Sequence, residues 1–238
     1  MEGKGRITGH TGLLALIGSP VGHSGSPAMY NYSFEKLGLD YAYVAFDIKV
    51  EEVKAALDAM RLFHMRGCNV TMPCKTEAAK YMDELSPAAR IIGAVNTIVN
   101  EDGKLIGHMT DGEGFVGNLR DHGIEIKGKK ITVAGGGGAA TAIQVQCALD
   151  GAREITIFNK NDAFFERTLQ TAEKIKKAVP DCVVNVYDID DTAKMTEEIQ
   201  SSDIFANATI VGMKPLDDQS VVKDLSAFRP GLVVADAV

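Results

Sequence analysis

The pattern of apolar and polar positions predicts strands and helices that alternate along the chain. Apolar runs short enough for buried strands cover residues 13–18, 67–71 and 131–133, and each leads into glycine, serine or proline residues that turn the chain. The segments between these runs place apolar residues at helical spacing. Strands and helices in this order are typical of α/β folds, so we expect this fold class.

In the first half, a helix is predicted directly after the first strand and its loop. Ser26 is expected to cap this helix, Pro27 to occupy its first turn and Gly38 to end it. Residues 1–12 are expected to be frayed. The other elements predicted here are a strand at 41–48, a surface helix at 53–61, a helix from 75 towards 82, and strands at 95–100 and 104–108 joined by an Asp-Gly hairpin turn.

The second half continues the alternation of strands and helices. The predicted strands are at 131–133, 154–158, 183–187, 204–206 and 232–235, with a helix near 193–199. A doubly wound parallel sheet is the simplest topology for this order. A helix that opens at residues 110–115, with Asp111 as its expected cap, is the natural hinge between the halves. We therefore expect two domains, residues 1–111 and 112–238.

Four consecutive glycines after the strand at 131–133 predict a phosphate-binding turn. Gly135, Gly137 and Ala140 satisfy the pattern G-x-G-x-x-A, in which missing side chains allow backbone N–H groups and a helix N-terminus to approach a pyrophosphate. A merely flexible glycine loop is the alternative. The strand at 154–158 favours the first interpretation, because polar residues follow it where the ribose of a dinucleotide would lie. These residues are Asn159, Lys160, Asn161 and Asp162.

Composition and charge exclude several classes of partner. With 45% hydrophobic and 24% charged residues the chain resembles ordinary soluble proteins, and its formal net charge of -7 argues against a nucleic-acid partner. No apolar run approaches the ~20 residues of a membrane span, and no signal-peptide pattern follows Met1, so we expect a cytoplasmic protein. The cysteines lack C-x-x-C pairing, which argues against disulfides and a metal site. They are Cys68, Cys74, Cys147 and Cys182.

Two serines before the first helix form a candidate anion site. Ser24 and Ser26 are placed beside unpaired N–H groups and the positive end of a helix, an arrangement suited to a carboxylate. The sequence leaves a purely structural role open, in which Ser26 only caps the helix and Ser24 only turns the chain.

Polar residues at other strand ends are further candidates for chemistry. Lys75 is predicted in the first turn of a helix, where the dipole disfavours the ammonium form and helps proton exchange, although an ordinary exposed lysine is the alternative. Asn96 and Thr97 are either half-exposed strand residues or point into a cleft. Asp111 either only caps its helix or also has a chemical role. The loop at 207–213 leaves the carboxyl end of a strand, where doubly wound sheets bind ligands.

Six motifs occur in order along nearly the whole chain. They are GSPVGHSGSP (18–27), NVTMPCK (69–75), GAVNT (93–97), TDGEG (110–114), AGGGGAA (134–140) and NATIVGM (207–213). Together these motifs and their spacing closely resemble those of shikimate dehydrogenases. The segments NKNDAFF (159–165) and GMKPL (212–216) look more like the quinate/shikimate dehydrogenase branch than the strictly NADP-dependent one.

The resemblance implies an N-terminal substrate-binding domain and a Rossmann-like, doubly wound NAD(P)-binding domain, with the reaction in a cleft between them. The implied reaction is the reversible NAD(P)-dependent reduction of 3-dehydroshikimate to shikimate in chorismate and aromatic amino-acid biosynthesis, with oxidation of quinate as an additional activity. Two alternatives stay open here. One is an NAD-dependent quinate dehydrogenase, and the other is a non-catalytic module that binds a dinucleotide or shikimate.

The resemblance also implies roles for single residues, none of them as a metal ligand. Lys75, paired with Asp111, would pass a proton to or from the reacting oxygen. The implied substrate-binding residues are Ser24 and Ser26 for a carboxylate, and Thr71, Lys75, Asn96 and Asp111 for the ring and its reacting oxygen. The implied cofactor-binding residues are Gly135, Gly136, Gly137, Gly138, Ala139, Asn159, Lys160, Asp162, Thr209 and Ala237.

The segment after the strand at 154–158 bears on the choice of cofactor. NADP-preferring relatives carry a basic pair there, which grips the 2′-phosphate. This chain keeps one positive charge at Lys160 and has Phe164 in place of the second arginine, while Asp162 can accept hydrogen bonds from a free 2′-hydroxyl. We therefore expect NAD or dual use, with NADP tolerated.

Two departures from the family pattern change what we expect of the carboxylate-binding loop and of the C-terminal part of the fold. Gly25 replaces a larger residue in the H-S-x-S-P segment, which is expected to loosen the carboxylate-binding loop. The chain stops at Val238, where family members continue through a tyrosine and C-terminal helices that return to the substrate domain. We expect a fold with these helices missing. Apolar surface left uncovered would favour self-association, for example as a homodimer.

Overall fold

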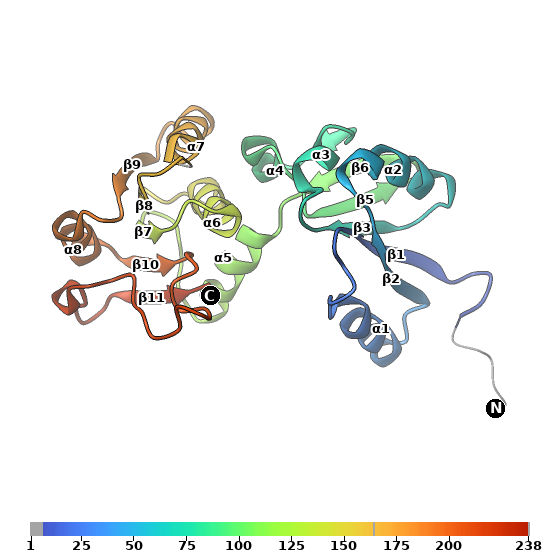
Figure 1. Ribbon diagram of the computed structural model, residues 1–238, viewed down its shortest axis with the longest axis horizontal. Coiled ribbons are helices and arrows are strands. Elements are labelled where there is room, and N and C mark those ends of the chain that lie inside the picture. The colour runs from blue at the N-terminus through green and yellow to red at the C-terminus, as the bar shows by residue number, and fades with distance from the viewer. Residues whose placement is uncertain (1–6, 164, 238) are drawn as a thin grey trace. The chain divides into compact units, whose positions relative to one another are not determined.

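The computed structural model describes residues 7–163 and 165–237, and the chain divides into two compact units. Unit 1 spans Met1–Met109 and unit 2 spans Thr110–Val238. Each unit contains one sheet with helices packed against it (Figure 1), which confirms the predicted α/β class. Of the residues expected to be frayed, 1–6 lie outside the described part of the chain, and Gly12 already belongs to the first strand.

The sheet of unit 1 is mixed, with the strand order β2-β1-β3-β5-β6-β4. Its strands are β1 (Gly12–Gly18), β2 (Tyr41–Asp47), β3 (Gly67–Val70), β4 (Glu84–Leu85), β5 (Thr97–Glu101) and β6 (Lys104–His108). β1 pairs in parallel with β2 and β3, whereas β5 runs antiparallel to β3 and β6. The helices are α1 (Ser26–Leu37), α2 (Val53–Leu62), α3 (Lys75–Ala79) and α4 (Pro87–Ile92), with a 3₁₀ turn at Val50–Glu52.

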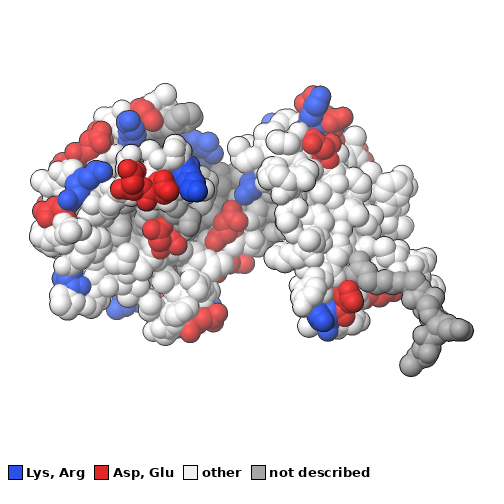
Figure 2. All heavy atoms as spheres, turned by 60° about the horizontal axis from the view of Figure 1, so that its bottom comes forward, with Lys and Arg blue, Asp and Glu red and all other residues white. Residues whose placement is uncertain are grey.

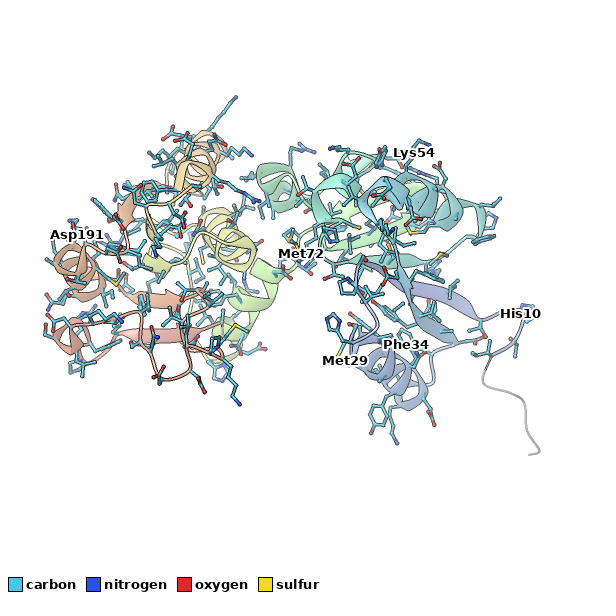
Figure 3. All side chains as sticks on the ribbon, viewed as in Figure 1. His10, Met29, Phe34, Lys54, Met72 and Asp191 are labelled. Atoms are coloured by element: carbon cyan, nitrogen blue, oxygen red, sulfur yellow. The ribbon has the colours of Figure 1, made fainter. Side chains whose placement is uncertain are left out.

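Helices cover both faces of this sheet. On one face, Phe34 of α1 packs against Leu16 of β1 in a buried cluster, and Figure 3 shows Phe34 on the helix beside the sheet. On the other face, α2 buries Leu57 and Met60 near Ile17, which follows Leu16 along the strand and therefore points to the opposite side. The alternating apolar residues of β1 thus tie both helices to the sheet.

The hairpin between β5 and β6 forms as predicted. Asp102 and Gly103 adopt φ values of 52° and 97°, the left-handed conformation that a two-residue type I′ turn requires. The side-chain oxygen of Asn100 accepts a hydrogen bond from Gly103 N at 2.8 Å, which fixes the turn.

The sheet of unit 2 is parallel, with the strand order β11-β10-β7-β8-β9. Its strands are β7 (Lys130–Ala134), β8 (Glu154–Asn159), β9 (Val183–Asp188), β10 (Ile204–Asn207) and β11 (Val233–Asp236). The helices are α5 (Asp111–Asp121), α6 (Gly138–Leu149), α7 (Phe165–Ala178) and α8 (Thr192–Ser201), with a 3₁₀ turn at Leu225–Ala227. The chain reverses its direction of winding at β7, so the predicted doubly wound, Rossmann-like topology is confirmed and a ligand site is expected at the carboxyl end of β7.

Two predicted helix caps were wrong by one residue. Gly25, not Ser26, is the N-cap of α1, and Thr110, not Asp111, is the N-cap of α5. In both cases the residue before the predicted cap already adopts helical φ and ψ, at -76° and -10° for Gly25 and at -99° and -5° for Thr110. Ser26 and Asp111 are therefore the first residues of their helices.

The segment after α3 also differs from the prediction. α3 ends at Ala79 instead of continuing towards Met82, and the short β4 and α4 that follow were not predicted. Ser86 caps α4, because its hydroxyl accepts a hydrogen bond from Ala89 N at 3.3 Å. The pair Ser86-Pro87 was the available sequence signal for a helix start.

The four cysteines are free and buried. Burial raises the pKa of the Cys68 thiol to about 12 and that of the Cys182 thiol to about 11, so both stay protonated at neutral pH. Across the described residues, no three or more His, Cys, Asp or Glu side chains gather in a way that could hold a metal ion.

Two observations describe the surface charge and the apolar character of the helices. On the face shown in Figure 2, basic side chains are intermixed with acidic ones and form no continuous basic surface. None of the described helices has the length and apolar character that crossing a membrane requires.

A buried charged network lies at the amino end of β7. Lys130 Nζ donates to Glu198 at 2.7 Å and to Glu154 at 3.1 Å. Glu198 also accepts from Lys194 Nζ at 2.8 Å and from Thr156 Oγ1 at 3.1 Å. Burial raises the pKa of the Glu198 carboxyl, but the hydrogen bonds from the two lysines outweigh burial and hold this pKa below its usual value. The network therefore joins β7, β8 and α8.

We predict that Glu198→Gln lowers the free energy of unfolding by about 2–3 kcal/mol at pH 7, because the buried Lys130 ammonium loses one of its two carboxylates. Since folding lowers the pKa of Glu198, its contribution is present above the unfolded pKa and is lost as the pH falls through the folded value. Urea unfolding at several pH values should therefore show the difference between variant and parent shrinking on acidification.

Glu173→Gln is the matched control. Glu173 pairs with Lys176 at 2.8 Å, but these side chains are 71% and 45% exposed, so little stability should be lost. Equal losses for the two variants would contradict the role given to the buried network.

Candidate functional site

The first two residues of the turn between β7 and α6 leave no room for a side chain. Gly135 has a φ of +120°, and a Cβ there would meet the backbone oxygen of Ala208 at 2.5 Å. A Cβ on Gly136 would meet Asn159 Nδ2 at 2.5 Å and would also collide with the hydroxyl of Thr168. The turn therefore lies directly against the segments that follow β8 and β10, and any side chain would push these segments away.

The other side of the turn is open. Gly137, Gly138 and Ala139 are exposed, and a Cβ on either glycine would meet no atom within 4 Å. Gly137 is the N-cap of α6, where no side chain caps the helix and the first turn carries no acidic residue. The first N–H groups of α6 and its dipole are thus suited to a pyrophosphate, and the glycine cradle fits the predicted cofactors NADP and NAD.

The residues predicted to bind the adenosine ribose begin with Asn159, the last residue of β8. Asn159 is half-buried, and its Nδ2 donates to Thr168 Oγ1 of α7 at 2.9 Å, which fixes the amide beside the turn. Lys160 and Asp162 are exposed, so this segment presents a cation and a carboxylate together. Phe164, which bears on the expected choice of cofactor, lies outside the described residues.

Asn207 organises the neighbouring edge of the sheet, a role that the sequence analysis missed. It is 7% exposed, and its Oδ1 accepts hydrogen bonds from Thr209 Oγ1 at 2.8 Å and Thr209 N at 3.2 Å. Its backbone oxygen accepts from Ala237 N at 2.9 Å, and its Nδ2 donates to Asp236 at 3.3 Å. Thr209 and Ala237 therefore lie at the same end of the sheet as the glycine turn. An asparagine closing a buried strand was the available signal.

In unit 1, the two predicted serines lie at the N-terminus of α1. Ser24 Oγ accepts a hydrogen bond from Ser26 N at 3.2 Å, and both residues are half-buried. The first turn of α1 carries no acidic residue. Ser24 therefore turns the chain, whereas Ser26 does not cap the helix, and the positive end of the helix favours an anion beside the two hydroxyls.

Backbone hydrogen bonds bring three further predicted residues together in unit 1. Thr71 N donates to Ile17 O at 2.9 Å, beside the carboxyl ends of β1 and β3. The carbonyl of Lys75 accepts from Val95 N at 3.0 Å, which places Lys75 near Asn96, the next residue along the chain. Asn96 is buried and Lys75 is half-buried, unlike an ordinary surface lysine. The three residues surround the loop between β3 and α3.

Asp111 belongs to unit 2, as the first residue of α5. The helix is anchored there, because Val116 and Leu119 on one of its faces are buried. Asp111 is exposed at the N-terminus of the helix. Its pairing with Lys75, which belongs to unit 1, remains a prediction.

We predict that Gly136→Ala weakens the binding of NADP and NAD at least tenfold, because the new Cβ displaces Asn159 and Thr168 from the turn. Binding of shikimate, the predicted substrate, should be retained, because its predicted carboxylate-binding serines lie in unit 1. Calorimetric titration with each ligand in turn measures both effects.

Gly117→Ala in α5 is the control for this substitution. Its Cβ would meet no atom within 4 Å, so both ligands should bind as in the parent and the helix should gain stability. Undiminished dinucleotide binding by Gly136→Ala would show that the turn does not receive the cofactor.

Comparison with known proteins places these residues in a family. A family profile described as the shikimate dehydrogenase substrate binding domain matches residues 16–98. The shikimate dehydrogenase (NADP(+)) of Listeria monocytogenes serotype 4b is 50% identical over 233 residues, which are 98% of this chain and 80% of that protein. A quinate/shikimate dehydrogenase of Escherichia coli is 44% identical over 232 residues, with the same two coverages.

A solved structure agrees with these relatives. Shikimate 5-dehydrogenase from Listeria monocytogenes, in complex with shikimate and NAD, matches with a TM-score of 0.95 at 50% identity, over 98% of this chain and 81% of that one. The resemblance predicted from the six motifs is therefore confirmed, and this chain belongs to the shikimate dehydrogenase family.

Proposed function

We propose that this chain is a shikimate dehydrogenase that reversibly reduces 3-dehydroshikimate to shikimate with NADP or NAD, within chorismate and aromatic amino-acid biosynthesis. The observation that carries the proposal is 50% identity, over 98% of the chain, to an enzyme named for this substrate and cofactor. The glycine turn of unit 2 and the polar residues around the β3–α3 loop of unit 1 supply the two binding sites that such a reaction needs.

Unit 1 holds the substrate in this proposal. Ser24 and Ser26 bind its carboxylate at the positive end of α1, without an arginine. Thr71 and Asn96 bind ring hydroxyls. Since Asn96 is only 9% exposed, its surroundings limit the orientations of its amide, which helps to hold the ring in one position.

Lys75 and Asp111 carry out the proton transfer. A bound nicotinamide supplies the carbon that exchanges a hydride with the substrate ring. Lys75 Nζ gives a proton to the reacting oxygen in one direction and removes it in the other, while Asp111 orients the ammonium and the hydroxyl. Lys75 is the first residue of α3, and its side chain is half-buried beside the loop between β3 and α3.

The segment after β8 supports the use of both cofactors. Lys160 can attract the 2′-phosphate of NADP, and Asp162 can accept hydrogen bonds from the free 2′-hydroxyl of NAD. The Listeria monocytogenes relative is named for NADP(+), and the solved structure from that organism holds NAD. These names agree with a binding segment of mixed charge.

Quinate is the second substrate that we propose, since the Escherichia coli relative at 44% identity is named quinate/shikimate dehydrogenase.

A cytoplasmic location is supported by the soluble metabolites that the reaction uses. A homodimer is supported by apolar surface in unit 1, where Leu62 and Phe63 at the end of α2 are 72% and 66% exposed.

The proposed function is tested by a matrix of substrates and cofactors. Shikimate and quinate are each incubated with NADP and NAD, and reduced nicotinamide is followed by absorbance. We expect turnover of shikimate with both cofactors and slower turnover of quinate. Turnover of quinate alone would make the chain a quinate dehydrogenase, and binding of both ligands without product would identify a non-catalytic module.

We predict that Lys75→Met lowers kcat for shikimate by about 10²–10⁴-fold, because the variant loses the proton donor and acceptor, while KM changes only a few-fold. Steady-state kinetics over a range of shikimate concentrations separates the two parameters. If Asp111 acts with Lys75, the loss in the double variant Lys75→Met/Asp111→Asn should be smaller than the product of the two single losses.

Lys80→Met is the matched control. Lys80 lies directly after α3 and pairs with Glu77 at 2.6 Å, with 62% of its side chain exposed, so kcat and KM should stay unchanged. Equal kcat in Lys75→Met and the parent would remove Lys75 from the mechanism.

A further inference from the structure

Gln144 is an unusual residue for its position in α6. It is 0% exposed, and the residues buried with it along the helix are small or apolar. These neighbours are Ala140, Ala142, Ile143, Val145, Cys147 and Ala148. Burying a long polar side chain costs free energy unless its amide finds hydrogen-bond partners.

Only half of this amide is satisfied. Gln144 Nε2 donates to the carbonyl of Gly135 at 2.9 Å, while Gln144 Oε1 is buried and has no hydrogen-bond partner among the described residues. An apolar side chain of the same length would remove the unpaired Oε1, but it would take the donor away from the carbonyl of the buried Gly135. The hydrogen bond to Gly135 is therefore a better explanation for glutamine here than packing is.

The hydrogen bond fixes one particular peptide plane. The cis peptide bonds of the described residues all precede prolines, so the bond between Gly135 and Gly136 is trans. In a trans peptide the C=O and N–H groups point in opposite directions. Holding the Gly135 oxygen against Gln144 thus turns the Gly136 N–H away from the Gln144 side chain. Glycine peptides have little intrinsic preference between such orientations, so a tether is needed.

Backbone hydrogen bonds already fix the two backbone groups that precede the Gly135 carbonyl. Gly135 N donates to Phe158 O at 2.7 Å, and Ala208 N donates to Ala134 O at 2.8 Å. The Gly135 carbonyl is the next acceptor along the chain, and it is the one that Gln144 holds. Three bonds from three different segments therefore set the start of the turn.

We propose that Gln144 is a positioning residue for the dinucleotide, and that it presets the Gly135–Gly136 peptide so that its carbonyl oxygen stays away from the pyrophosphate. This proposal rests on the proposed function, since it needs a dinucleotide at the glycine turn. Without Gln144 the Gly135–Gly136 peptide can rotate and present its oxygen to the pyrophosphate. The free energy needed to order the turn then weakens dinucleotide binding.

The test is Gln144→Met, which keeps the length of the side chain and removes the donor. The dissociation constants for NADP and NAD, measured by calorimetric titration, should rise about five- to tenfold. KM for the dinucleotide should rise similarly with kcat unchanged, and the dissociation constant for shikimate should stay the same. The melting temperature should change little, because removal of the unpaired Oε1 offsets the loss of the donor to the Gly135 carbonyl.

Gln146→Met is the control on the same helix. Gln146 is half-buried and donates to Asp150 at 2.9 Å, away from the turn, so dinucleotide affinity should be unchanged. Equal dinucleotide affinity in the parent and Gln144→Met overturns the proposal. So does a loss of shikimate affinity and melting temperature that parallels the loss of dinucleotide affinity, because it indicates general destabilisation.

The parent chain distinguishes the proposal from the function on which it rests. If the parent binds no dinucleotide, the proposed function fails and the proposal fails with it. If the parent binds dinucleotide and Gln144→Met does not fold, the proposal is tested by hydrogen exchange of the Gln144 side-chain amide in the parent. The Gln144 amide protons should exchange far more slowly than those of the exposed Gln170, and equal rates would overturn the proposal.

Discussion

The close approach of backbone segments at the carboxyl end of β7 is the constraint on which unit 2 depends. Because Gly135 and Gly136 carry no side chains, the segments after β8 and β10 can lie against one turn. Backbone bonds from Gly135 to Phe158 and from Ala208 to Ala134 hold these strand ends in register. Residues that are distant in sequence therefore share one edge of the sheet, and the backbone N–H groups needed for a phosphate remain accessible there.

In unit 1, backbone hydrogen bonds also hold together the segments that carry the predicted substrate-binding residues, here at the ends of a mixed sheet. Ser19 N donates to Met72 O at 3.0 Å, which ties the loop after β1 to the loop after β3. Val95 N donates to Lys75 O at 3.0 Å, which ties the start of α3 to the segment before β5. These bonds fix the backbone of segments that carry the predicted substrate-binding residues. In both units, predicted site residues thus lie in or beside loops that backbone hydrogen bonds hold in place.

The sequence predicted local features well where a single residue type decides the conformation. The glycine turn, the Asp102-Gly103 hairpin and the parallel sheet of unit 2 follow from glycine conformation and from strand and helix periodicity. The caps of α1 and α5 were displaced by one residue, because the backbone before Ser26 and Asp111 is already helical. Such a shift depends on the entering loop rather than on the identity of the cap residue.

Hydrogen bonds between separate elements could not be predicted from the sequence pattern. Gln144 falls on a helix where periodicity gives no hint that its amide meets Gly135 nine residues earlier. Asn207 meets Ala237 only because β10 and β11 pair in parallel. The nearness of Lys75 and Asn96 likewise follows from a backbone bond between α3 and the segment before β5. These contacts link separate elements, so they become visible only once the elements are packed.

The central claim is that the backbone of residues 136–139 receives the dinucleotide, and amide chemical shifts report on this backbone directly. In ¹⁵N-labelled protein titrated with NADP, the account predicts the largest shifts at the amides of Gly136, Gly137 and Gly138. Saturable binding of NADP that leaves these amides unshifted, with the changes elsewhere in the chain, would contradict it.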